Sequence, residues 1–85
     1  MPDDKNAIRN SIRRLRFEHG EMTQDELARQ AGVTRHTIMA LEARKYFPSL
    51  LLAFRIARAF HAGVEQVFEY TETGEAGIPA QPPAL

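Results

Sequence analysis

Residues 23–45 read TQDELARQAGVTRHTIMALEARK, which is the pattern of two short helices joined by a tight turn. Thr23 is a residue type that caps helix N-termini, and Glu26 three positions later completes a capping box. Gly32 stands where the first helix should end, because glycine adopts a positive φ without a Cβ clash. Thr34 then caps a second helix, so the stretch predicts a helix-turn-helix.

Apolar residues in both predicted helices recur with the 3.6-residue period that places them on one inward face. These inward positions are Leu27, Ala28, Ala31, Ile38 and Leu41. The positions left available on the outside of the second helix are Arg35, His36, Met39 and Ala40. In a helix-turn-helix, the N-terminal end of the second helix enters the major groove of DNA.

The flanking sequence predicts three more helices. Ile8, Ile12 and Leu15 form the inward stripe of a first helix that runs from Ala7 to near His19. Its other faces carry Arg9, Arg13, Arg14 and Arg16. These arginines suit either contact with phosphates or a solvated surface.

Ser49 is a suitable cap for a fourth helix, which is followed by a short fifth helix from Val64 to Phe68 or Tyr70. The inward positions of the fourth helix are predicted to be Leu50, Ala53, Ile56, Ala57 and Phe60. Leu51, Leu52 and Phe54 widen its apolar face, either as core or as a surface for a second copy. The expected fold is all-α: a compact five-helix DNA-binding domain over 7–70, with a flexible N-terminal arm (1–6) and a flexible acidic, Pro-rich C-terminal tail (71–85).

Composition limits the class of protein. A chain of 85 residues has room for one small domain with a modest core. It contains no cysteine, which excludes disulfides and thiolate zinc sites and suits a cytoplasmic location. The longest apolar run, 50–54, is far shorter than the roughly 20 residues of a membrane span, and no signal peptide is recognisable.

The net charge is zero, but the charges are unevenly distributed. Residues 5–58 contain all eleven Lys and Arg against five Asp and Glu, a net charge of +6, whereas residues from 59 onward contain four Glu and no Lys or Arg. A basic body of this kind suits a polyanionic partner such as nucleic acid, although chance alone also produces uneven charge.

Four segments within residues 8–68 resemble the Cro/lambda-repressor-like (Xre) helix-turn-helix family, in its small single-domain form. They are IRRLRFEHG (12–20), MTQDELARQAGVTRHTIMALE (22–42), KYFPSLLLAFRIARAF (45–60) and VEQVF (64–68). The resemblance implies a transcriptional regulator that binds a specific double-stranded DNA sequence with a recognition helix over 34–45. It also implies that the regulator is a repressor.

The same resemblance assigns DNA contacts. Base contacts fall on Arg35, His36, Met39 and Ala40; an arginine can bind O6 and N7 of guanine together, which is worth roughly 1–3 kcal/mol of discrimination. For His36 a solvated surface role stays open. Contacts with the DNA backbone fall on Gln24, Thr34, Thr37, Arg44, Lys45, Tyr46, Arg13 and Arg14.

Arg16 and Glu42 resemble a structural ion pair of the family, between the first helix and the recognition helix. Two positions depart from the family pattern. Arg44 replaces a common glycine, so we expect the recognition helix to continue further, and His61 replaces the glycine that often ends the fourth helix.

No pattern indicates catalysis, a metal site or a cofactor. The three histidines lie far apart in the sequence, at positions 19, 36 and 61, and no nucleophile or phosphate-loop motif is present. The chain is therefore expected not to be an enzyme.

The expected partner is double-stranded DNA, with a homodimer on a palindromic operator. The sequence does not decide where the dimer interface lies. The candidates are Leu51, Phe54, the last helix around Val67 and Tyr70, and the tail. The alternative function is a protein-interaction adaptor or antitoxin that uses the same scaffold and binds a protein partner through its C-terminal tail.

Overall fold

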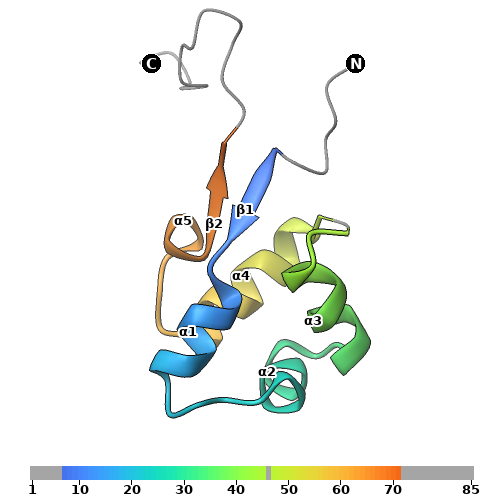
Figure 1. The fold of residues 1–85 in the computed structure, drawn as a ribbon, viewed down its shortest axis with the longest axis vertical. Coiled ribbons are helices and arrows are strands. Elements are labelled where there is room, and N and C mark those ends of the chain that lie inside the picture. Colours follow the sequence, from blue (N-terminus) through green and yellow to red (C-terminus); the bar gives the residue numbers. More distant parts are fainter. Residues whose placement is uncertain (1–6, 46, 72–85) are drawn as a thin grey trace, which may run out of the picture.

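A computed structural model describes residues 7–45 and 47–71. In chain order the elements are β1 (Ile8–Asn10), α1 (Ile12–Glu18), α2 (Gln24–Ala31), α3 (Arg35–Glu42), α4 (Leu50–Ala59), α5 (Val64–Val67) and β2 (Phe68–Tyr70), drawn in Figure 1. The described residues thus form five helices, which confirms the predicted helical class. The expectations for the arm (1–6), for Tyr46 and for residues 72–85 of the tail lie outside the described residues.

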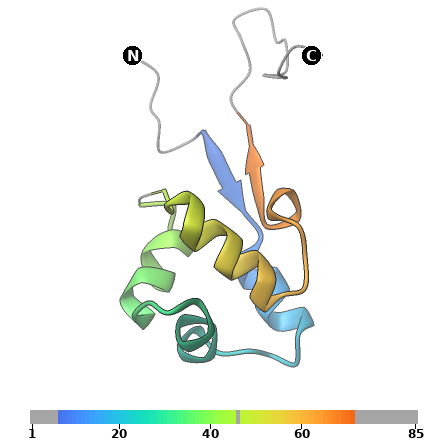
Figure 2. The same ribbon diagram turned by 180° about the vertical axis from the view of Figure 1, so that it is seen from behind.

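Helix α4 lies at the centre of the helical layer. In Figure 2 it runs diagonally across the molecule; it packs against α2 and α5, and α2 in turn packs against α3. Every buried side chain among the described residues is hydrophobic, and all five helices contribute to the core. The largest fully buried side chains are Phe60, Ile12, Leu27, Ile38, Leu41, Ile56 and Val67.

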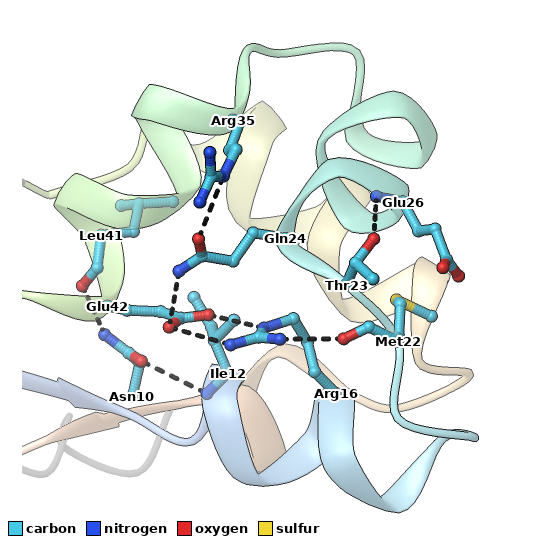
Figure 3. A network of polar contacts seen from close by, with 10 residues as sticks. All are labelled: Asn10, Ile12, Arg16, Met22, Thr23, Gln24, Glu26, Arg35, Leu41 and Glu42. Carbon is cyan, nitrogen blue, oxygen red and sulfur yellow. Dashed lines mark hydrogen bonds and ion pairs between the residues drawn. The ribbon is translucent and has the colours of Figure 1, made fainter.

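The α2–α3 pair forms the predicted helix-turn-helix. Thr23 Oγ1 accepts a hydrogen bond from the Glu26 N–H at 3.0 Å, while the Glu26 carboxylate points away from Thr23 (Figure 3), so half of the expected capping box is formed. Gly32 has φ +74° and ends α2, and the Val33 N–H donates back to the Ala28 carbonyl at 2.9 Å. Thr34 Oγ1 caps α3 by accepting from the Thr37 N–H at 3.2 Å.

A two-stranded antiparallel sheet joins the two ends of the domain and was not predicted. Ile8 pairs with Tyr70 and Asn10 with Phe68, so Ile8 lies in β1 instead of in the first helix, and α5 ends at Val67. The Ser11 N–H donates to the Val67 carbonyl at 2.8 Å, and the Thr71 N–H donates to the Ala7 carbonyl at 2.8 Å. These hydrogen bonds hold both ends in an extended conformation.

The end of the recognition helix differs from expectation, and a left-handed backbone conformation explains the difference. The recognition helix was expected to extend to residue 45, but α3 ends at Glu42 because Arg44 adopts φ +59°, a left-handed conformation that cannot continue a right-handed helix. His61 has φ +54° just after α4. Both residues therefore adopt the left-handed conformation that glycine commonly takes after a helix.

At the start of α4, the first buried leucine lies two positions later in the sequence than predicted. Leu50 was predicted to point inward, but it is exposed, and Leu52 is buried instead. Ala53, Ile56, Ala57 and Phe60 are buried as predicted.

Candidate nucleic-acid interface

The first turn of α3 presents polar side chains to solvent while its other face is anchored in the core. Arg35 and His36 are exposed, whereas Ile38 and Leu41 are buried. One turn further, Met39 is 43% exposed and Ala40 is half-buried. The four residues predicted to contact bases therefore lie on α3 with at least part of each side chain accessible.

Arg16 of α1 and Glu42 at the end of α3 form a two-pronged ion pair. Arg16 Nε lies 2.7 Å from Glu42 Oε2, and Nη2 lies 3.2 Å from Oε1 (Figure 3). Arg16 Nη1 also donates to the Met22 carbonyl at 2.8 Å. The side chains are only 16% and 13% exposed, so water weakens the pair less than it would at the surface. The pair thus attaches α1, the turn before α2 and the end of α3 to one another.

Gln24, the first residue of α2, connects this ion pair to Arg35. Its Nε2 donates to Glu42 Oε1 at 3.2 Å, and its Oε1 accepts from Arg35 Nε at 3.4 Å. The amide therefore turns its donor toward a carboxylate and its acceptor toward a guanidinium, as the two charges require. A continuous polar chain, visible in Figure 3, links Arg16 through Glu42 and Gln24 to Arg35.

An open groove of about 1050 Å³ brings residues of α1, α2 and α3 together. Arg13 and Arg14 of α1 are exposed and line it, and Gln24 and Met39 line it from α2 and α3. Arg14 Nη1 also lies 3.2 Å from Glu18 Oε2, in an exposed pair along α1. One candidate for base contact, Met39, therefore borders the same depression as the candidates for phosphate contact Arg13, Arg14 and Gln24.

The remaining predicted contacts lie at the two ends of α3. At its start, Thr34 Oγ1 lies 3.1 Å from Thr37 Oγ1, and Thr37 is half-buried. Beyond its end, Arg44 is half-buried and Lys45 is exposed.

Two residues around the groove were missed by the sequence reasoning. Phe17 of α1 is exposed and lines the groove, although no contact or core position was predicted for it. Asn10 also lines the groove, and its Nδ2 donates to the Leu41 carbonyl at 2.8 Å. Asn10 lay inside the predicted first helix, and the sequence carried no signal for a contact 31 residues away.

No group of three His, Asp or Glu side chains in residues 7–45 and 47–71 is arranged to hold a metal ion. Over the same residues, each helix is too short or too polar to cross a membrane.

Comparison with known proteins gives consistent matches. Residues 12–66 match the model of the helix-turn-helix family HTH_3. The chain is 49% identical over 65 residues to an uncharacterized HTH-type transcriptional regulator of Archaeoglobus fulgidus, covering 76% of this chain and 91% of the relative. A regulator of the same description from Methanothermobacter thermautotrophicus is 52% identical over 68 residues, covering 79% and 97% of the two chains.

A solved structure has the same arrangement of elements. The hypothetical transcription factor NHTF from Neisseria superposes with a TM-score of 0.63 at 28% identity, over 78% of each chain.

Proposed function

Because this chain belongs to the Cro/lambda-repressor-like (Xre) helix-turn-helix family, we propose that it is a transcriptional regulator that binds a specific double-stranded DNA sequence through α3. The observation that carries the proposal is the fixed first turn of α3. Thr34 caps the helix, and Gln24 Oε1 holds Arg35 Nε at 3.4 Å. A side chain held in this way loses less conformational freedom when it binds a base.

The proposed docking places the N-terminal end of α3 in the major groove. Arg35 and His36 would donate to base edges, and Met39 and Ala40 would contact thymine methyl groups. Phosphates would be bound on both sides of α3 by Gln24, Thr34, Thr37, Arg44, Lys45, Tyr46, Arg13 and Arg14. Phosphate contacts of this kind fix the orientation of a protein on the duplex, whereas the base contacts select the sequence.

We propose that two copies bind a palindromic operator, with half-sites about 34 Å apart. One copy contacts few base pairs, so specific binding in a genome requires a second copy. On α4, Leu51 and Phe54 are 59% and 57% exposed, and they line an apolar groove of about 440 Å³ that supports this helix as the dimer surface. Bound in this way in the cytoplasm, the protein would repress transcription by blocking polymerase.

The test is selection of DNA from a random duplex library by the purified full chain. We expect the wild-type protein to enrich a palindromic sequence, and the double variant Arg35→Ala/His36→Ala to enrich none while its circular dichroism stays helical. The matched control is Arg29→Ala/Gln30→Ala, two exposed residues of α2 that are outside the proposed contacts. Enrichment of the same sequence by the Arg35/His36 variant, or no enrichment by folded wild-type protein, would contradict the proposal.

The second candidate function is a protein-interaction adaptor or antitoxin. It is favoured by the three exposed apolar side chains at the start of α4, Leu50, Leu51 and Phe54. A salt titration separates the two functions. Binding to DNA through six or more phosphates weakens about 10³- to 10⁵-fold between 50 and 200 mM salt, whereas an adaptor has no such DNA binding to lose.

A further inference from the structure

Asn10 makes two hydrogen bonds that join the start of α1 to the end of α3. Its Nδ2 donates to the Leu41 carbonyl at 2.8 Å, and its Oδ1 accepts from the Ile12 N–H at 3.2 Å (Figure 3). We propose that Asn10 is a positioning residue, which sets the angle of α3 against α1 and thereby the DNA sequence preference. This inference rests on the proposed function, because the preference it concerns is that of α3 for bases.

The oxygen and the nitrogen of the Asn10 side-chain amide bind different helices. The oxygen satisfies a backbone N–H in the first turn of α1, where a helix leaves its donors without partners. The nitrogen reaches the last turn of α3, where the Leu41 carbonyl also accepts from the Arg44 N–H at 2.9 Å. Both lone pairs of that carbonyl are thus used, one by the backbone just after α3 and the other by a side chain of β1.

Asn10 and Arg16 together hold two successive residues of α3. Asn10 binds the backbone of Leu41 just before α1 begins, and Arg16 binds the side chain of Glu42 from the last turn of α1. Ile38 and Leu41 already anchor α3 in the core, and the two attachments along α1 set its direction relative to α1. That direction determines how Met39 of α3 lies relative to Arg13 across the groove, and with it where Arg35 lies at the start of the same helix.

Asn10 is itself held by the sheet. It pairs with Phe68 as the last residue of β1, and the next residue, Ser11, donates its N–H to the Val67 carbonyl at 2.8 Å. The pairing of β1 with β2 therefore holds Asn10 in place, and Asn10 in turn holds the end of α3. A binding interface needs its side chains placed to within about 0.5 Å and 10–20°, so a small rotation of α3 is enough to weaken base contacts.

The variant that isolates this role is Asn10→Ser. A serine hydroxyl can still accept from the Ile12 N–H, but it is too short to reach the Leu41 carbonyl, and no charge is added beside the arginines. The control is Ser49→Ala, which removes the bond from the Leu52 N–H to Ser49 Oγ (3.1 Å) and destabilises α4 by loss of a helix cap. Both variants are measured at a temperature at which circular dichroism shows each to be fully folded.

The first readout is the ratio of affinity for the selected operator to affinity for a scrambled duplex. For Asn10→Ser we expect this ratio to fall about three- to tenfold, the equivalent of one lost hydrogen bond, with binding to scrambled DNA unchanged. Ser49→Ala should keep the wild-type ratio, because a loss of stability alone affects both duplexes equally. A wild-type ratio in Asn10→Ser would overturn the proposal.

The second readout is amide hydrogen exchange in the protein without DNA. The amides of Ala43, Arg44 and Lys45 close the last turn of α3, and we expect them to exchange faster in Asn10→Ser than in Ser49→Ala. This measurement does not depend on DNA binding. If wild-type protein selects no sequence, the proposed function fails on its own, whereas equal exchange rates at these three amides would overturn the positioning role of Asn10.

Discussion

The guanidinium of Arg16 and the carboxylate of Glu42 meet through two nitrogens and two oxygens, at 2.7 and 3.2 Å, in a largely shielded part of the molecule. Arg16→Ala leaves Glu42 with a poorly solvated charge, and we expect it to lower the free energy of unfolding by about 3 kcal/mol. Urea unfolding followed by circular dichroism measures this change. Arg14→Ala removes an exposed pair with Glu18 and should cost at most about 0.5 kcal/mol. Equal losses in the two variants would contradict a structural role for Arg16.

The contacts of Gln24 predict that its substitution weakens DNA binding much more than it lowers stability. Gln24→Ala removes the link between Glu42 and Arg35 but leaves the ion pair in place, so we expect the affinity for the selected operator to fall about tenfold. Stability should fall by less than about 1 kcal/mol. Fluorescence anisotropy with a labelled duplex measures the affinity. Gln30→Ala, an exposed glutamine in the same helix, should bind as wild type; a similar loss there would show that the effect is not specific to Gln24.

The left-handed conformation of His61 predicts a stabilising substitution. A non-glycine residue at φ +54° costs about 1–2 kcal/mol, of which glycine recovers a part after its larger entropy loss on folding. We expect His61→Gly to raise the free energy of unfolding by about 0.5–1 kcal/mol. Thermal unfolding tests this. Gly32→Ala makes the opposite change at φ +74° and should destabilise, and destabilisation by both variants would disprove the argument.

The exposed arginines of α1 predict the salt dependence of DNA binding. Four cationic side chains in each copy are proposed to contact phosphates: Arg13, Arg14, Arg44 and Lys45. For a dimer, log Kd should then change with log salt concentration with a slope of roughly 7, and Arg13→Gln/Arg14→Gln should reduce it to about half that value. Affinities measured between 50 and 200 mM salt give the slope. An unchanged slope in the variant would exclude α1 from the phosphate contacts.

The exposed side chains of α4 predict the oligomeric state. Leu51→Glu or Phe54→Glu places a charge on the proposed dimer surface, and either should convert the dimer to a monomer without unfolding it, because both positions are already in contact with water. Sedimentation equilibrium measures the mass. Phe17→Glu, at an exposed aromatic residue on α1, is the control and should remain dimeric. If both α4 variants remain dimeric, the dimer interface does not lie on this face of α4.

The helix-turn-helix was predictable because its signals act locally. Thr23 and Thr34 each bind an amide three residues further on, and Gly32 ends α2 through its own φ. The buried positions of α2 and α3 followed from the 3.6-residue period. The same period placed Arg35 and His36 outside, where the structure has them. Their contacts with DNA stay predictions.

The sheet was not predictable, because strand pairing joins residues that are distant in sequence. Ile8 and Tyr70 pair across almost the whole domain, and a strand of three residues is too short to show alternation. Ile8 is also in helical phase with Ile12 and Leu15, so the pattern favoured a longer first helix. The buried residue among the leucines at 50–52 was not predictable either, because three successive apolar residues do not indicate which one faces the core.

The end of α3 and the polar network depend on geometry that the residue types do not specify. Arginine in place of glycine favoured a longer helix, but Arg44 adopts the glycine conformation and α3 ends at Glu42. The bond from Asn10 to the Leu41 carbonyl spans 31 residues. The Asn10 side chain points toward Leu41 because of the position of β1, and β1 was not predicted.

The hydrogen bond between the Thr71 N–H and the Ala7 carbonyl means that the chain enters and leaves the domain at one place. Figure 1 shows this place at the tip of the sheet, at the opposite end of the molecule from α2. Any segment attached before residue 7 or after residue 71 therefore starts from a common point, away from the helix-turn-helix. A reporter protein could be joined at either end, and a short linker between the two ends would permit a circular permutant opened in the turn between α4 and α5.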